Sequence, residues 1–223
     1  MAQAGIHGVL AQAVRKWVPG RQWLMLGIVF GSLFPDADNL LVALATVLKR
    51  PVEGLHRTFT HSLITALVVL IIFWVIGALQ KQPRWTNFGL GFAIGILLHT
   101  LLDLLIWFSG VQLFWPFPLW VNLWAGATPP VWFMTLMNPL EFLFLGMFFY
   151  MLLVLARRHE TDSDFLRPLR VWMIIELVLF LIFLPLMYSS IKLTYTVYGL
   201  LYLVSLFVAL VFTVRMRATV EAV

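Results

Sequence analysis

The sequence predicts an all-α fold, a polytopic integral membrane bundle of about five transmembrane helices. Three observations support this class: 62% of the 223 residues are hydrophobic, only 11% are charged, and the mean hydropathy is +0.96. A soluble domain has about a quarter of its residues charged. No Gly/Ser-rich linker, low-complexity run or internal repeat divides the chain. We therefore expect a single membrane domain over residues 1–223.

Residues 1–22 carry one histidine and three basic residues before and after a Pro-Gly break, which predicts a short amphipathic helix on the membrane surface. The net charge of +5 is typical of a chain whose Lys and Arg side chains flank membrane spans and contact anionic headgroups. No basic face interleaved with exposed aromatic residues is present, so we expect no nucleic-acid partner.

Two apolar stretches follow, residues 23–34 and 40–48, and each is too short to cross a bilayer. Pro35 is expected to end the first stretch, with Asp36 and Asp38 in a turn or helix cap behind it. We therefore predict a hairpin of two half-helices that packs against the bundle, with the two aspartates at its bend.

Longer apolar segments predict five transmembrane helices, at residues 62–79, 87–108, 139–156, 171–188 and 195–214, the fourth kinked at Pro185. Residues 109–138 are rich in Trp and Pro and carry no charge, which indicates an interfacial loop that dips partly into the membrane. The second span returns to the membrane face where the first began. Asp103 should therefore lie at the level of His61, with His99 about one turn deeper.

Ligand-type side chains concentrate in the apolar N-terminal half, where an unpaired charge is costly unless it binds a metal. The residues are Asp36, Asp38, His56, His61, His99 and Asp103. The chain has no cysteine, so a metal would have to be bound by imidazole and carboxylate groups. That donor set suits zinc, manganese or iron.

The spacing of these residues constrains how they meet. His99 and Asp103 are four residues apart and share a helix face at about 6 Å, so either both bind a metal or Asp103 orients the imidazole. His56 and His61 are five apart and cannot share a helix face. We expect His56 in the loop and His61 in the first helical turn, with a threonine between them as the N-cap.

Other polar residues have two interpretations each. Arg57 either holds an anionic substrate oxygen in a bidentate contact or binds lipid headgroups. His7 either completes a metal coordination shell or lies on the surface of the amphipathic helix. Glu141 and Glu176 either neutralise basic partners or relay protons.

Four ordered motifs within about residues 1–120 resemble the YdjM-type family of membrane-bound metal-dependent hydrolases. They are Leu33-Phe34-Pro35-Asp36-Ala37-Asp38, the heptad His56-Arg57-Thr58-Phe59-Thr60-His61-Ser62, His99-Thr100-Leu101-Leu102-Asp103, and Gly110-Val111-Gln112 followed by Trp115-Pro116-Phe117. The family is loosely similar to zinc-dependent phospholipase C, whose helical site also uses a His-x-x-x-Asp helix. The expected second His-x-x-x-Glu pair is absent, because Ser163 follows His159 at i+4.

The resemblance implies Asp36, His56 or His61, His99 and Asp103 as metal ligands, with His7 as an early ligand. Asp38 joins this set because two neighbouring carboxylates in apolar sequence indicate a cation. Zinc is the metal that the resemblance favours.

We therefore predict a metal-dependent hydrolase that acts on a lipid or lipid-linked ester, most simply a phosphoester, at one membrane face. The metal would activate water, Arg57 would hold the developing anionic oxygens, and Asp38 or Asp103 would serve as base or orienter. The alternatives are a transporter or proton-coupled carrier, and a non-enzymatic scaffold stabilised by metal. The expected location is the inner membrane of a bacterium, with membrane lipids as partners.

Overall fold

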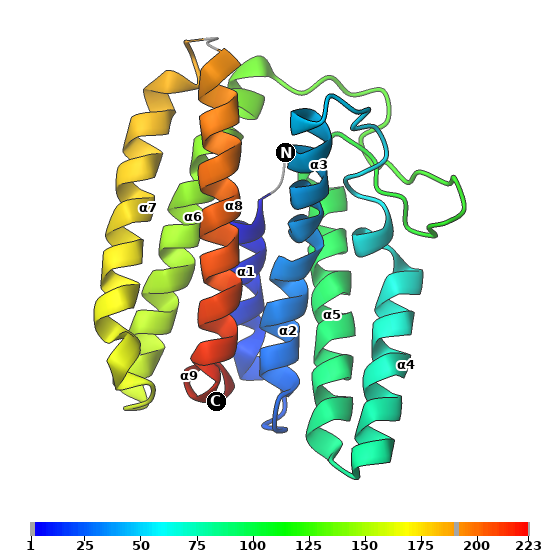
Figure 1. Cartoon of the computed structure of the whole chain (residues 1–223), viewed down its shortest axis with the longest axis vertical. Helices are drawn as coiled ribbons and strands as arrows, with labels where there is room; N and C mark the ends of the chain where they lie inside the picture. Colours follow the sequence, from blue (N-terminus) through cyan, green and yellow to red (C-terminus); the bar gives the residue numbers. More distant parts are fainter. Residues whose placement is uncertain (1–2, 190–191, 223) are drawn as a thin grey trace.

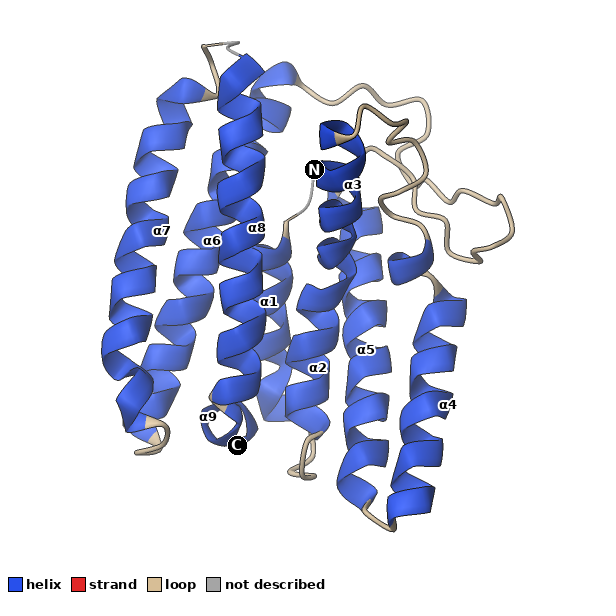
Figure 2. Cartoon of the chain, in the orientation of Figure 1, coloured by secondary structure: helices blue, strands red, loops and turns tan. Residues whose placement is uncertain are grey.

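The protein is an all-α bundle, as the composition predicts. The computed structural model describes residues 3–189 and 192–222, which contain helices, short 3₁₀ turns and loops but no β-strand (Figure 2). The helices that make up the membrane-length segments are α2 (Leu24–Leu33), α3 (Asn39–Val47), α4 (Leu63–Gln80), α5 (Pro83–Ile106), α6 (Val131–Arg158), α7 (Leu166–Leu186) and α8 (Lys192–Arg215). The other elements are α1 (Ala4–Ala13), α9 (Arg217–Glu221) and the 3₁₀ turns η1 (Val14–Trp17), η2 (Phe34–Asp38), η3 (Phe59–His61) and η4 (Ser163–Phe165).

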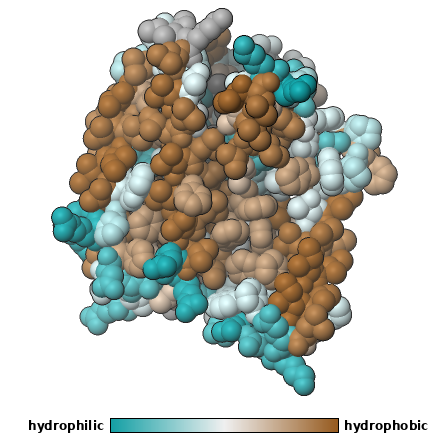
Figure 3. Space-filling model, viewed as in Figure 1, coloured by the Kyte–Doolittle hydropathy of each residue, from teal (hydrophilic) through white to brown (hydrophobic). Residues whose placement is uncertain are grey.

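The described residues hold six helical segments long and apolar enough to cross a membrane. These are Leu24–Val47, Leu63–Gln80, Pro83–Ile106, Val131–Arg158, Ser163–Leu186 and Leu193–Arg215. Figure 3 shows the matching surface, a broad hydrophobic belt with hydrophilic residues gathered at the lower edge. The prediction of a polytopic membrane bundle is confirmed.

The predicted hairpin of half-helices is wrong, and this accounts for the sixth span. Helix α3 continues from α2 through η2 in nearly one line, so that 24–47 forms one membrane-length segment (Figure 1). Pro35 lies in the first turn of η2, a position at which proline is tolerated because its fixed φ suits a helical turn. The chain therefore continues through Pro35 as a 3₁₀ turn and does not reverse its direction to form a hairpin. Asp36 and Asp38 lie inside a span and not at a surface bend.

The first helix is also placed differently from the prediction. Helix α1 lies within the bundle, packed against α2, α5 and α6, and not on the membrane surface (Figure 1). Gly5 and Gly8 make this possible, because a Cβ at Gly5 would clash with the backbone of Leu145 and one at Gly8 with the ring of Phe148. His7 is consequently buried, which rules out its interpretation as a surface histidine.

Helices α2 and α5 approach each other through two glycine pairs. Gly27 and Gly31 on α2 face Gly91 and Gly95 on α5, and a Cβ at any of the four would collide with the backbone of the opposite helix. Small residues spaced by four allow this close packing between membrane helices. The contact brings Ser32, at the end of α2, against the turn of α5 that carries the predicted ligands.

The C-terminal helices form an apolar half of the bundle. Helix α6 begins at Val131, eight residues before the predicted start, and continues through Pro139. Pro185 lies near the end of α7, where it ends the span within two residues. Aromatic side chains from α6, α7 and α8 fill this half, among them Phe142, Phe149, Phe183 and Phe212.

Candidate metal centre

All seven predicted ligands meet in one place, and we call them the His/Asp cluster. Helix α1 contributes His7, η2 contributes Asp36 and Asp38, the segment 56–61 contributes His56 and His61, and α5 contributes His99 and Asp103. They form three overlapping groups that could hold a metal ion: His7, His99 and Asp103; Asp36, His61 and His99; Asp38, His56 and His61. His56 is half-buried and the other six are buried.

His99 is held in one orientation by the backbone of α2. Its Nδ1 lies 2.8 Å from the carbonyl oxygen of Ser32, which can only accept, so Nδ1–H is the donor. A neutral imidazole carries one ring proton, and Nε2 is therefore left with a free lone pair. A hydrogen bond from the second ring nitrogen to a backbone carbonyl is a usual means of fixing the tautomer of a metal-binding histidine.

His61 is held in the same tautomer by side chains. The Thr60 hydroxyl donates to Asp38 Oδ2 at 2.9 Å, so its oxygen accepts from His61 Nδ1–H at 2.9 Å. Asp38 Oδ2 itself lies 3.4 Å from His61 Nδ1. Burial, together with the neighbouring His99, holds the pKa of His61 well below its ordinary value and keeps the ring neutral. Its Nε2 therefore also carries a free lone pair.

The two lone pairs face each other. His61 Nε2 and His99 Nε2 are 3.1 Å apart, a distance at which two acceptors repel unless a cation or proton lies between them. Asp36 Oδ1 lies 3.8 Å from His99 Nε2, and Asp103 Oδ2 lies 3.6 Å from His61 Nε2. Ligand atoms about 2.0–2.2 Å from a tetrahedral zinc ion are about 3.3–3.6 Å from one another. Asp36, His61 and His99 thus form one group that could hold a metal ion, and Asp103 Oδ2 lies 3.6 Å from His61 Nε2 and 4.0 Å from His99 Nε2.

Asp38 lies behind the histidines and orients them. Its Oδ1 accepts from His56 Nδ1 at 2.8 Å, and its Oδ2 accepts from the Arg57 backbone N–H at 3.2 Å. One carboxylate thereby holds both imidazoles of the segment 56–61, whose ring centroids are 5.3 Å apart. His56 and His61 therefore share their surroundings, although they cannot share a helix face.

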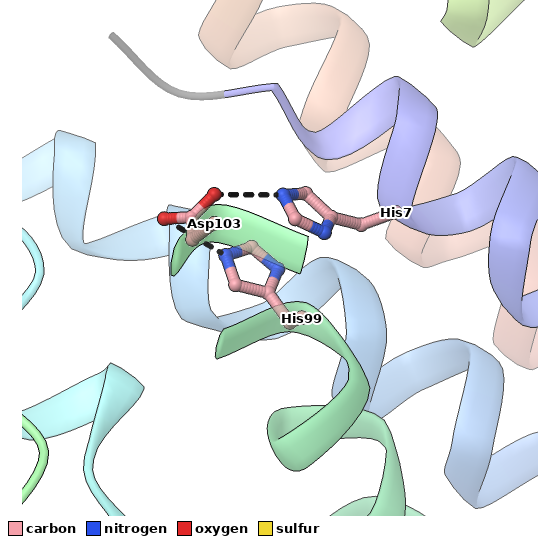
Figure 4. A group of neighbouring side chains, drawn as sticks. All are labelled: His7, His99 and Asp103. Atoms are coloured by element: carbon pink, nitrogen blue, oxygen red, sulfur yellow. Dashed lines mark hydrogen bonds and ion pairs between the residues drawn. The ribbon is translucent and has the colours of Figure 1, made fainter. Parts of the chain in front are cut away.

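Asp103 joins three elements. Its Oδ1 accepts from His7 Nε2 at 3.1 Å, and the His7 ring stacks on that of His99 with centroids 3.6 Å apart (Figure 4). On its other side, Oδ2 lies 3.1 Å from Arg57 Nε. Asp103 therefore has a guanidinium partner as well as an imidazole, which offsets the cost of burying its charge.

Arg57 is built into the site. Its guanidinium also donates to the Ser109 hydroxyl and lies over the Trp107 ring at 5.2 Å. Its backbone has φ +61°, a left-handed conformation that non-glycine residues seldom adopt and that is often found at functional sites. The 109–130 segment is tied to the same place, because the Gln112 N–H donates to the Arg57 carbonyl at 2.9 Å.

The start of α4 differs from the prediction. The N-cap is Ser62, whose Oγ accepts from the backbone N–H of Ile64 at 3.0 Å, and neither Thr58 nor Thr60 caps the helix. His61 consequently lies in the 3₁₀ turn η3 before the helix, and not in its first turn. Thr60 is thus free to connect His61 with Asp38.

The two buried glutamates have different surroundings. Glu141 accepts from the Gly5 backbone N–H at 3.0 Å, and Asp36 Oδ2 accepts from the Gln3 N–H at 3.1 Å, so two carboxylates satisfy the start of α1. Glu176 on α7 lies beside the hydroxyl of Ser205 on α8 and reaches no backbone group within the described residues. Neither glutamate has a basic ion-pair partner within the described part of the chain.

Some site residues were missed by sequence reasoning. Ser32, Thr60 and Gln3 act through a backbone carbonyl, a bridging hydroxyl and a backbone N–H, none of which has a pattern of its own in the sequence. The glycine spacing on α5, residues 91 and 95, is a signal that could have placed α5 against another helix.

Fold and site together define a polytopic helical membrane protein with a buried His/Asp cluster able to hold a metal ion. The family model described as YdjM inner membrane protein matches residues 3–192, well beyond the first 120 residues that carry the motifs. The chain therefore belongs to the YdjM inner membrane protein family and is a multi-pass inner membrane protein. No curated protein and no solved structure matches it.

Proposed function

We propose that the protein is a membrane-embedded, metal-dependent hydrolase that acts on a lipid or lipid-linked ester, with zinc as the metal. The observation that carries this proposal is the contact between His61 Nε2 and His99 Nε2. Each nitrogen has a free lone pair, the two atoms are 3.1 Å apart, and two carboxylates lie around them. When bound, a divalent metal would act as a Lewis acid that activates water near neutral pH and stabilises negative charge on the ester.

The residues of the His/Asp cluster and Arg57 would have separate roles in this reaction. His61, His99 and Asp36 would hold the metal, with Asp103 as a fourth ligand or as the proton acceptor for water. Asp38 would keep His61 in the metal-binding tautomer through Thr60. Arg57 would act as a positioning residue, because its Nε lies on Asp103.

A lipid substrate is supported by the position of the cluster inside a bundle of membrane spans. The 109–130 loop beside it exposes Trp115, Phe117, Trp120 and Trp124, side chains typical of the headgroup level. A water-soluble ester would have to leave the water and enter the bundle of membrane spans to reach the cluster.

Metal analysis of the purified full chain is the direct test. The wild type should contain about one zinc per chain, and His61→Ala combined with His99→Ala should contain almost none. His159→Ala is the matched control, since His159 lies at the end of α6, outside the His/Asp cluster. A wild-type protein without a bound transition metal would overturn the proposal.

Turnover distinguishes the remaining alternatives. Hydrolysis of a lipid phosphoester in a panel of membrane lipids, lost in the double variant, supports the hydrolase. A protein that binds metal and hydrolyses nothing is a scaffold, and flux of a solute into liposomes would instead favour a carrier.

A further inference from the structure

An apolar groove lies beside the His/Asp cluster, between α3 and α8, and we call it the α3–α8 groove. Its volume is about 350 Å³, and its walls include Asn39, Ala43 and Val47 of α3 and Tyr195, Gly199 and Tyr202 of α8. No charged side chain lines it within the described residues. The two helices lie side by side in the upper half of the bundle (Figure 1).

The groove opens toward the lipid. Val47 is 76% exposed and Leu200 is 56% exposed, and both line it on helices that cross the membrane. From Asn39 to Val47 the groove follows the nine residues of α3, which are eight steps of 1.5 Å or about 12 Å. It therefore leads from the end of α3 to the depth at which the aspartates of η2 lie.

The inner end of the groove is polar and reaches the cluster. The Asn39 amide donates to the Asp36 carbonyl at 2.9 Å and lies 3.3 Å from Asp38 Oδ1. Tyr202, opposite on α8, is buried, and its hydroxyl has no hydrogen-bond partner among the described residues. An unpaired buried hydroxyl at this position can donate to a group that enters the groove.

We propose that the α3–α8 groove holds one hydrocarbon chain of the lipid substrate, and that the polar group attached to this chain lies at Asn39 and Tyr202. This inference rests on the proposed function and narrows its substrate to lipids that enter sideways from the bilayer. A groove of this volume falls within the size range of small-molecule sites.

The physical role of such a groove is orientation. A hydrocarbon chain gains little by moving from lipid into an apolar groove, because both surroundings are equally apolar. The polar end must therefore determine where the chain stops, which holds the attached ester next to η2. Positioning of this kind lowers the barrier of a reaction without requiring tight binding.

Photolabelling of the full chain in vesicles tests the proposal. The probe is phosphatidylglycerol with a diazirine in one acyl chain, at a low fraction in phosphatidylethanolamine and phosphatidylglycerol vesicles, and labelled peptides are mapped by mass spectrometry. Labelling should concentrate on α3 and α8 residues of the groove above the level on α4, whose lipid-facing surface lacks this groove.

Gly199→Phe is the decisive variant. A Cβ at Gly199 meets nothing within 4 Å, so the ring can occupy the groove without disturbing the helix. Groove labelling should fall about tenfold, the loss expected when an occupied cavity is overpacked. Val211→Phe on the same helix is the control, because Val211 faces lipid but does not line the groove. Ala43→Phe replaces Gly199→Phe if that variant fails to fold.

Even labelling of all lipid-facing helices, or labelling unchanged by Gly199→Phe, would overturn the groove proposal. Metal content is measured on the same samples and separates the two proposals. If the groove is labelled but the protein contains no metal, the lipid site is supported and the metal-dependent hydrolase is overturned. If the protein contains metal but all lipid-facing helices are labelled evenly, the groove proposal is overturned and the metal site is retained.

Discussion

The buried acids of the His/Asp cluster and Glu176, in the two halves of the bundle, differ in how many segments supply their polar partners. In the N-terminal half, Asp36, Asp38 and Asp103 each accept a hydrogen bond from a backbone or imidazole N–H. In the C-terminal half, Glu176 is equally buried, and its polar neighbour within the described residues is the hydroxyl of Ser205 on α8. Partners drawn from several separate segments indicate a site that the fold is built to hold. Glu176, by contrast, is a single acid in an aromatic and aliphatic core.

The difference has a structural cause in the helix packing. In the N-terminal half the glycines of α2 and α5 bring two backbones into contact, which places the Ser32 carbonyl on His99. In the C-terminal half large side chains such as Phe142 and Phe149 separate the helices. There the Tyr198 hydroxyl of α8 reaches the Asn138 carbonyl of α6 at 2.8 Å, but Glu176 reaches no backbone group within the described residues.

The largest expected effect comes from breaking the α2–α5 contact. A side chain at Gly95 would collide with the Ile28 carbonyl and the Ser32 N–H, so Gly95→Leu should destabilise the fold by at least about 3 kcal/mol. The measurement is the yield of folded protein and its thermal midpoint in detergent.

Gly199→Leu is the matched control, because the same side chain enters open space there. Equal tolerance of both variants would show that the glycine contact does not hold the two helices together.

A matched pair of acid-to-amide changes tests the comparison itself. Asp103→Asn leaves Arg57 without its carboxylate partner and should cost about 3 kcal/mol of stability, the lower end for a broken buried ion pair. Glu176→Gln removes no ion pair and should cost about 1 kcal/mol or less. Both are compared by thermal unfolding in excess chelator, so that metal binding does not contribute. Similar costs for the two variants would remove the distinction between the halves.

A change at Asp38, which contacts His56 and His61, is expected to act on metal affinity and less on stability than the loss of Asp103. Asp38→Asn keeps the shape of the side chain but weakens its hold on His56 and His61, and should lower metal affinity about 10- to 100-fold. Competition with a metal indicator gives the affinity. Asp164→Asn, an exposed acid in η4, should leave it unchanged. An undiminished affinity in Asp38→Asn would mean that Asp38 does not orient the ligands.

Much of the site was predictable because its signals are local. The residue types of the His/Asp cluster, and the return of the second span toward His61, both follow from sequence order. The prediction that Asp103 lies at the level of His61 is confirmed by a distance of 3.6 Å between His61 Nε2 and Asp103 Oδ2. The roles of the individual residues stay predictions until metal content and turnover are measured.

Composition, the long apolar runs and the ordered motifs by themselves determined an all-α membrane protein of the YdjM family, since hydrophobicity and motif order are properties of the chain alone. Tertiary structure decided the rest. In the sequence, Pro35 cannot be distinguished from a proline that ends a helix. The role of the two glycine pairs becomes apparent only when α2 and α5 are seen to face each other. The positions of α1 and the free Nε2 atoms depend on such contacts between distant segments.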